Sequence, residues 1–202
     1  MTQAARGPGR PRDEEVRKRI LASAAQLLKE KAFDDITVDA IAEGSGSCKA
    51  TVYRWWPNKA AVLIEAFRET VSRELPYPDT GDFRTDIQLQ LRNFVKIILG
   101  GRGKVFARFI AGAQADPDVA EAFREAWIRP RRAEAKKVFA RYVESGVARP
   151  DLDLDLAVEI LFSPLYYRLL TGWGKITDAY IEELTDTALH GLLRREEDGP
   201  AK

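Results

Sequence analysis

Apolar residues recur every three or four positions along most of the chain, which is the spacing of one buried face of an α-helix. Residues 13–31 show this first, with Val16, Ile20 and Leu27 on one face. Beyond residue 82 the same spacing predicts further helices, over about 83–99, 103–114, 117–145, 153–172 and 177–194. No alternation of apolar and polar residues is long enough for a strand. The pattern predicts an all-α fold of about nine helices.

The stretch after the first helix has the pattern of two short helices joined by a tight turn. Thr37 is a helix-capping residue type, and Ile36 and Ile41 have the spacing of a hydrophobic staple around it. Gly46 ends this helix, and a second one follows over 49–56 and stops before a proline. Two short helices joined by a glycine turn are typical of a helix-turn-helix unit.

Local composition divides the chain into four parts. Residues 1–12 are rich in Gly, Pro and Arg and have no apolar face to pack, so we expect a flexible basic arm. Asn58 caps a longer helix that completes a three-helix helix-turn-helix domain, residues 13–75. The segment PYPDTGD then forms a hinge. A helical C-terminal domain for ligand binding and dimerisation, residues 82–195, and a tail, residues 196–202, complete the prediction.

Charge and composition limit the classes of function. The 202 residues are 45% hydrophobic and 31% charged, an ordinary soluble composition with room for one sizeable core. Lys and Arg number 32 against 31 Asp and Glu, so any basic surface is local, and residues 1–60 carry a net charge of +3. One Cys and one His leave no internal disulfide and too few ligands for a metal, so we expect no metal and no cofactor. No apolar run approaches the ~20 residues that span a bilayer, so we expect a cytosolic protein without a membrane partner.

The candidate catalytic groups do not come together. Cys48 and His190 fall in different predicted domains, so they form no nucleophile and base pair. GGRGKV lacks the first glycine of a phosphate-binding loop and the Ser or Thr after its lysine. The sequence therefore predicts no catalytic residue and no enzyme.

The second short helix carries side chains suited to DNA. Lys49 and Arg54 can donate to guanine O6 and N7, and the methyl of Ala50 or Thr51 can meet a thymine methyl. Tyr53 can donate its hydroxyl to a phosphate. A helix that enters the major groove needs such a polar face opposite an apolar one that holds it to its scaffold. Double-stranded DNA is the predicted partner.

The segment from Thr37 to Lys59 resembles the DNA-binding half of the TetR family of bacterial repressors, at Thr37, Ala40, Ile41, Ala42, Gly46, Thr51, Tyr53, Pro57 and Lys59. Residues 116–132 and 152–172 look like one of the C-terminal ligand-domain types of that family. The resemblance implies phosphate clamps at Thr37, Tyr53 and Lys59, and base-facing side chains at Lys49, Thr51, Arg54 and Trp55. It also implies a homodimer on a palindromic operator in the bacterial cytoplasm, associated with the nucleoid when DNA-bound and released by a small-molecule inducer.

Three positions depart from the family pattern. Ala32 replaces the usual glycine at the end of the first helix, Ser47 replaces a small aliphatic residue, and Cys48 replaces a hydroxyl cap. Because sulfur is a poor acceptor, Ser47 can cap the helix in place of Cys48, which leaves the register of the base contacts open. A redox role for the thiol is a further alternative.

The basic arm contains Gly9-Arg10-Pro11-Arg12, which matches the core of an AT-hook. Arg10 and Arg12 are therefore candidates for the minor groove of A·T-rich DNA. Plain disorder of the arm fits the same residues equally well.

The C-terminal half offers a candidate cavity and a candidate interface. Its cavity candidates are aromatic residues with a few polar ones: Phe94, Phe106, Arg108, Phe109, Gln114, Trp127, Phe162, Tyr166, Tyr167 and Arg168. The helix over 153–172 is apolar nearly all round, as in a helix covered on two sides. The resemblance implies that it and the last helix meet a second subunit through Leu161, Leu165, Leu184, Ala188 and Leu192. A helical small-molecule or lipid-binding protein without specific DNA regulation is the alternative function.

Overall fold

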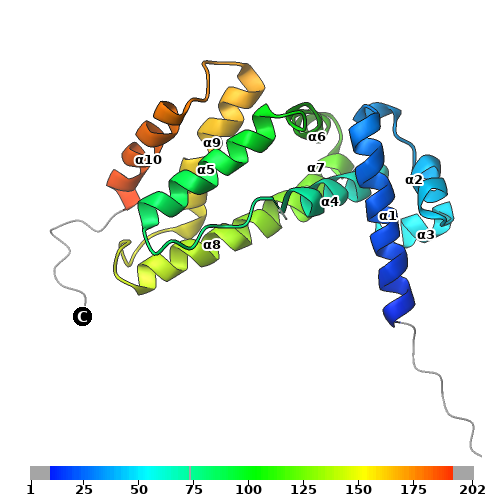
Figure 1. Ribbon diagram of the computed structural model, residues 1–202, viewed down its shortest axis with the longest axis horizontal. Helices are drawn as coiled ribbons and strands as arrows, with labels where there is room; N and C mark the ends of the chain where they lie inside the picture. Colours follow the sequence, from blue (N-terminus) through cyan, green and yellow to red (C-terminus); the bar gives the residue numbers. More distant parts are fainter. Residues whose placement is uncertain (1–9, 73, 193–202) are drawn as a thin grey trace, which may run out of the picture.

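A computed structural model describes residues 10–72 and 74–192, and every regular element in these two ranges is a helix. Figure 1 shows an elongated molecule, with the helices α1 to α3 at one end and α10 at the other. The predicted all-α fold is confirmed. No helix in the described ranges is long and apolar enough to cross a membrane.

The N-terminal unit consists of α1 (Arg10–Glu30), a 3₁₀ turn (Phe33–Asp35), α2 (Val38–Ser45), α3 (Lys49–Trp55) and α4 (Lys59–Ser72). Ile20, Ile41 and Leu63 are fully buried where α1, α2 and α4 meet. The expected start of α1 at residue 13 was wrong, because the helix begins at Arg10. Pro11 does not prevent this, since the first turn of a helix has N–H groups without intrahelical partners. Residues 1–9 of the predicted arm lie outside the described residues, as does the tail.

Local hydrogen bonds fix the helix boundaries. Thr37 Oγ1 accepts from the backbone N–H of Ala40 at 3.1 Å, and Asn58 Oδ1 accepts from that of Ala61 at 2.9 Å. Gly46 has a φ of 64°, a left-handed conformation that glycine adopts without strain, and it closes α2. The caps predicted from the sequence at Thr37, Gly46 and Asn58 are confirmed. The 3₁₀ turn that buries Phe33 was not predicted.

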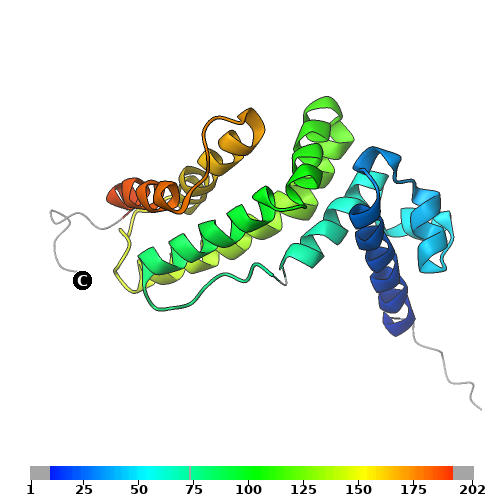
Figure 2. The ribbon, with the colours of Figure 1, turned by 45° about the horizontal axis from the view of Figure 1, so that its top comes forward.

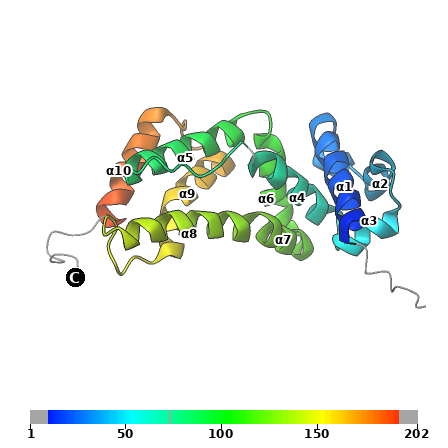
Figure 3. The same cartoon turned by 60° about the horizontal axis from the view of Figure 1, so that its bottom comes forward.

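The C-terminal half consists of α5 (Phe83–Leu99), α6 (Gly103–Ala115), α7 (Pro117–Phe123), a π turn (Arg124–Ile128), α8 (Arg129–Glu144), α9 (Leu154–Thr171) and α10 (Asp178–Leu192). Figures 1 and 2 show α5 and α8 running roughly parallel, and Figure 3 shows α9 in the space between them. Helix α10 lies at the end of this bundle away from the N-terminal unit. Figure 3 shows α6 and α7 between this bundle and α4. The bundle therefore meets the N-terminal unit through α6, α7 and the π turn.

The predicted single helix over 117–145 is interrupted by the π turn. The N–H of Arg129 donates to the carbonyl of Arg124, five residues back instead of four. Pro130 follows directly and has no N–H to continue an α-helical ladder, which explains the wider turn at this point. Pro164 lies inside α9 without ending it.

An aromatic cluster joins the two halves. Phe67 of α4 lies between Phe109 of α6, at 5.3 Å between ring centroids, and Trp127 of the π turn, at 5.6 Å. Phe33 reaches the same cluster from the 3₁₀ turn, with its ring 5.4 Å from that of Phe109. Arg108 adds an ion pair to Asp34 at 3.3 Å. The halves thus share one continuous apolar core.

Candidate nucleic-acid interface and ligand cavity

Helix α3 has one face in the core and the other in solvent. Val52 and Trp56 are buried, whereas the side chains of Tyr53 and Trp55 are 46% and 37% exposed. Lys49, Ala50 and Arg54 are exposed beside them, and Thr51 is half-buried. The DNA-reading candidates of this helix therefore lie together on its solvent side.

A carboxylate inside the N-terminal unit anchors the end of α3. The indole N–H of Trp56 donates to Glu65 of α4, and the same carboxylate accepts from Arg17 of α1 and from Arg68 at 3.4 Å. One side chain thus ties together α1, α4 and the end of α3. Glu65 was not singled out from the sequence, because its partners are 48 and 9 residues away and no local pattern connects them.

The start of α3 is capped by neither candidate side chain. Cys48 occupies the N-cap position, but its sulfur accepts no backbone N–H and instead lies 3.1 Å from Thr51 Oγ1. This hydrogen bond lowers the pKa of the exposed thiol. The Ser47 hydroxyl is buried and has no partner, so capping by Ser47 was wrong. With the helix starting at Lys49, the register of its exposed face is set.

Two lysines of the interface are engaged within the protein. Lys49 Nζ lies 3.1 Å from Asp39 Oδ2, a hydrogen bond that raises the pKa of the lysine. Lys59 Nζ donates to the carbonyls of Phe33 and Asp34 at 3.1 and 3.2 Å and lies over the Phe33 ring. Lys59 thereby supports the 3₁₀ turn, and one of the three donors of its ammonium remains for a phosphate. Arg54 has its guanidinium over the Trp55 ring.

Two further DNA candidates lie at the start of α1. Arg10 and Arg12 are in its first turn, and their side chains lie outside what the structure describes. Thr37 is exposed, with its hydroxyl oxygen occupied by the helix cap.

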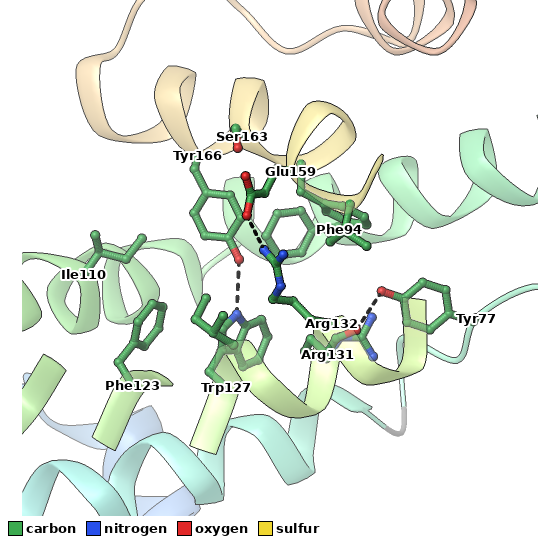
Figure 4. A pocket seen from close by; sticks show the side chains of 13 residues that line it. Tyr77, Phe94, Ile110, Phe123, Trp127, Arg131, Arg132, Glu159, Ser163 and Tyr166 are labelled. Carbon is green, nitrogen blue, oxygen red and sulfur yellow. Dashed lines mark hydrogen bonds and ion pairs between the residues drawn. The ribbon is translucent and has the colours of Figure 1, made fainter. Parts of the chain in front are cut away.

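A cavity of about 250 Å³ lies among the π turn, α5, α8 and α9 (Figure 4). Four of the predicted cavity residues line it: Phe94, Trp127, Phe162 and Tyr166. Other lining residues were not predicted, namely Tyr77, Ile110, Phe123, Ile128, Arg131, Arg132, Val158, Glu159 and Ser163. The wall is therefore mostly aromatic and aliphatic, with charged groups at one side.

The remaining cavity candidates do not line this cavity. Phe106 and Phe109 are fully buried in the core and do not line the cavity. Arg108 and Gln114 are exposed on α6. Tyr167 is 56% exposed, because consecutive residues of a helix point about 100° apart and its neighbour Tyr166 faces inward.

Arg168 is also outside the cavity. Its Nη1 donates to the Lys175 carbonyl at 2.5 Å, and its guanidinium stacks on the ring of Tyr180. It therefore fastens the loop between α9 and α10.

The polar groups of the cavity are held in hydrogen bonds. The Tyr166 hydroxyl accepts from Trp127 Nε1 at 3.2 Å, and burial raises the pKa of this tyrosine to about 12. The Tyr77 hydroxyl donates to the Arg131 carbonyl at 3.4 Å, and burial likewise raises its pKa to about 12. Both phenols keep their protons at neutral pH. Arg132 Nη1 donates to Glu159 at 2.9 Å, and this pair, which lines the cavity, joins α8 to α9.

Comparison with known proteins finds a matching family model for each half of the chain. Residues 20–66 match the family model for bacterial regulatory proteins of the tetR family. Residues 77–188 match that for a tetracyclin repressor-like C-terminal domain. The chain belongs to the TetR family of transcriptional regulators. It is thus a DNA-binding regulator and not an enzyme, and the alternative of a carrier without DNA regulation is not favoured.

Relatives of this TetR-family chain match it over nearly its whole length. The HTH-type transcriptional regulator YdeS of Bacillus subtilis is 39% identical over 184 residues, 91% of this chain and 93% of that protein. The DNA-binding transcriptional repressor TetR of Mycobacteroides abscessus is 28% identical, over 87% of this chain and 92% of that one. The crystal structure of the TetR family transcription regulator SCO0332 superposes with a TM-score of 0.81 and 34% identity, covering 89% of this chain and 100% of that one.

The subunit contacts expected for a TetR-family dimer need correction. Leu161 and Leu165 are fully buried within the chain and have no surface to offer a partner, and Ala188 is nearly fully buried. Leu184 is half-buried, and the Leu192 side chain is outside the described set. These leucines lie inward because their own bundle covers that side of α9 and α10.

The opposite side of α9 is an exposed apolar stripe. Its members are spaced by one or two helical turns and continue just beyond the helix: Leu156, Ile160, Tyr167, Leu170 and Trp173. Tyr167 and Trp173, at 56% and 71% exposed, are among the most exposed large apolar side chains described. An exposed apolar stripe of this kind is typical of a protein interface.

Proposed function

We propose that this regulator is a homodimeric repressor that binds a palindromic DNA operator through α3 and releases it when a small molecule fills the cavity. The observation that carries the proposal is the contact between Phe67 of α4 and Trp127, a cavity-lining residue. A ligand that contacts Trp127 therefore acts, through Phe67, on α4, the helix that comes next after α3 in the chain. Coupling of this kind requires the ligand to favour the arrangement of the dimer that does not bind DNA.

The proposed DNA contacts lie on and around α3. Tyr53, Thr37 and the remaining Lys59 donor hold phosphates, and the exposed face of α3 meets base edges through Lys49, Ala50, Thr51, Arg54 and Trp55. Ser47 is not part of this set, because its hydroxyl is buried. We further propose that Arg10 and Arg12 reach the adjacent minor groove.

Dimerisation through the exposed stripe of α9 supplies the second α3. A two-fold interface places the same side chains on both subunits, so Ile160 and Tyr167 lie near their counterparts. One helix in one major groove makes too few contacts for selective binding, whereas a dimer reads two half-sites spaced by about 34 Å or a multiple of it. The name of the M. abscessus relative, a repressor, supports repression over activation.

Titration of the full-length protein against DNA from both sides of its own gene tests this proposal. We expect protection of an inverted repeat and an affinity that falls steeply with salt, because bound phosphates release counterions. Arg54→Ala weakens binding at one base position by about 1–3 kcal/mol, whereas loss of a phosphate contact weakens all sequences alike. Equal affinity for operator and random DNA at every salt concentration contradicts the proposal.

A further inference from the structure

The two arginines that line the cavity, Arg131 and Arg132, are already paired with carboxylates of the protein. Arg131 is buried, and its Nη1 donates to Glu134 at 2.6 Å and to the Leu75 carbonyl at 3.2 Å. Its guanidinium also stacks on the ring of Tyr77, 4.6 Å from the centroid. A carboxylate ligand next to Arg131 has to compete with Glu134 for the same cation.

Arg132 is also paired with carboxylates. It donates to Glu159 and to Asp155, both at 2.9 Å. Glu159 itself lines the cavity, so an anionic ligand meets a carboxylate there. Transfer of an unpaired charge into such a site costs several kcal/mol, which disfavours a charged ligand.

The Tyr166 hydroxyl is different, because no acceptor for its proton lies among the described residues. Trp127 can only donate, so the phenol oxygen is the acceptor in their hydrogen bond. Among residues 10–72 and 74–192, no group accepts the proton of this hydroxyl. Since burial raises the pKa of Tyr166 to about 12, the proton is present at neutral pH. The hydroxyl of Tyr77, in contrast, already donates to the Arg131 carbonyl.

The shape and walls of the cavity limit the rest of the ligand. Its 250 Å³ is below the ~300–1,000 Å³ of pockets for drug-sized ligands, which leaves room for about two fused rings. The rings of Phe94, Phe123 and Trp127 form flat walls on which an aromatic ligand can stack or pack edge to face.

We propose that the cavity binds an uncharged, planar aromatic molecule of about two rings that presents one carbonyl or ether oxygen to the Tyr166 hydroxyl. This inference rests on the proposed function of the cavity as the inducer site. Its consequence for regulation is direct, because the same phenol oxygen holds Trp127, which packs on Phe67 of α4. Two residues, Tyr166 and Trp127, therefore connect the ligand oxygen to Phe67 of the DNA-binding unit.

Three isosteric probes test the inference by calorimetric titration into the full-length protein without DNA. 2-Acetonaphthone carries the carbonyl, 2-isopropenylnaphthalene replaces it by a methylene group, and 2-naphthoate replaces its methyl group by a charged oxygen. We expect the ketone to bind about fivefold tighter than the hydrocarbon, the effect of one neutral hydrogen bond. The carboxylate binds weakest of the three.

The variant Tyr166→Phe removes the hydroxyl and keeps the ring. It should abolish the advantage of the ketone over the hydrocarbon, whereas the matched control Tyr167→Phe, on the exposed side of α9, leaves it unchanged. If Tyr166→Phe does not fold, the order of the three probes on the unaltered protein decides alone. Tightest binding of 2-naphthoate, no binding of any probe, or a ketone advantage that survives in Tyr166→Phe overturns the inference. Binding in the expected order without operator release contradicts the proposed inducer role and leaves the ligand class standing.

Discussion

The ring of Phe67 lies 5.6 Å from the indole of Trp127, and this pair joins a helix of the DNA-binding unit to the wall of the cavity. Both residues are buried, and each also touches Phe106. Because cores are packed as tightly as crystals, a displacement of the indole has to be taken up by its neighbours. The pair is therefore the shortest aromatic path from the cavity to α4.

Replacement of Phe67 by Leu tests this coupling. The substitution keeps an apolar side chain and removes the flat ring, so the free energy of unfolding should fall by about 1–3 kcal/mol. Operator affinity without ligand should stay close to that of the unaltered protein, while the ligand concentration needed for release rises. Denaturant unfolding and operator titrations with and without ligand measure both effects. An unchanged response to ligand would show that the signal takes another route.

The dimer prediction concerns the exposed stripe of α9. Ile160→Glu places a charge near its own counterpart across the two-fold axis, which should convert the dimer into a folded monomer. Leu99→Glu, an equally drastic change at an exposed site on α5, is the matched control and should remain dimeric. Sedimentation at low micromolar concentration distinguishes the two states. Monomers of Ile160→Glu should also lose cooperative operator binding.

Asp39 restrains a lysine of the DNA-facing helix. Asp39→Asn removes the partner of Lys49 and one negative charge beside the phosphates, so operator affinity should rise about two- to fivefold, the range of an exposed ion pair. In the unaltered protein, Asp39 raises the pKa of Lys49. Without Asp39 the lysine still stays protonated at neutral pH. Glu43 is an exposed carboxylate on α2, the helix that also carries Asp39, and Glu43→Gln serves as the control for net charge. Equal gains in both variants would assign the effect to charge alone.

Glu65 positions α3 without being available to DNA. Glu65→Gln weakens its hydrogen bonds with Trp56, Arg17 and Arg68, and the free energy of unfolding should fall by about 1–3 kcal/mol. Operator affinity falls as well, because the end of α3 is less firmly held. Glu69→Gln, one turn further along α4 and 3.8 Å from Arg17, is the control. Loss of stability with full operator affinity would argue against a positioning role.

A buried pair between α5 and α8 predicts a pH effect. The Tyr142 hydroxyl donates to Asp86 Oδ2 at 2.6 Å, and burial together with this hydrogen bond raises the pKa of Tyr142 to about 12. The unfolded chain ionises this tyrosine near pH 10, so its contribution is complete below about pH 10 and is lost as the pH rises through 12. At pH 7, Tyr142→Phe should cost about 1–3 kcal/mol of unfolding free energy.

The difference between Tyr142→Phe and the unaltered protein should therefore narrow between pH 10 and pH 12. Denaturant unfolding across this range measures it, with the exposed Tyr53→Phe as control. A constant difference would mean that Tyr142 does not titrate as its burial requires.

Helix boundaries were accessible from the sequence because they depend on neighbours. Thr37 and Asn58 each accept from a backbone N–H three residues ahead, so residue type and position suffice to predict the cap. The face of α9 was not accessible in this way. The helix is apolar nearly all round, and nothing in its periodicity distinguishes Leu161, which is inside, from Ile160, which is outside. Glu65 and Tyr166 depend on partners far along the chain, so only the folded structure brings their roles out.

The π turn before Pro130 has a consequence for how chain length can vary at this site. A π turn contains one residue more than an α-helical turn, so it sets the angular phase between α7 and α8. Removal of one residue from 124–128 would rotate α7 by about 100° and shift it by about 1.5 Å relative to α8. Asn58, which donates to the Asp118 carbonyl of α7 at 3.5 Å, would lose that partner. Among homologous chains, a single-residue deletion here should therefore occur together with changes on the facing surface of α4.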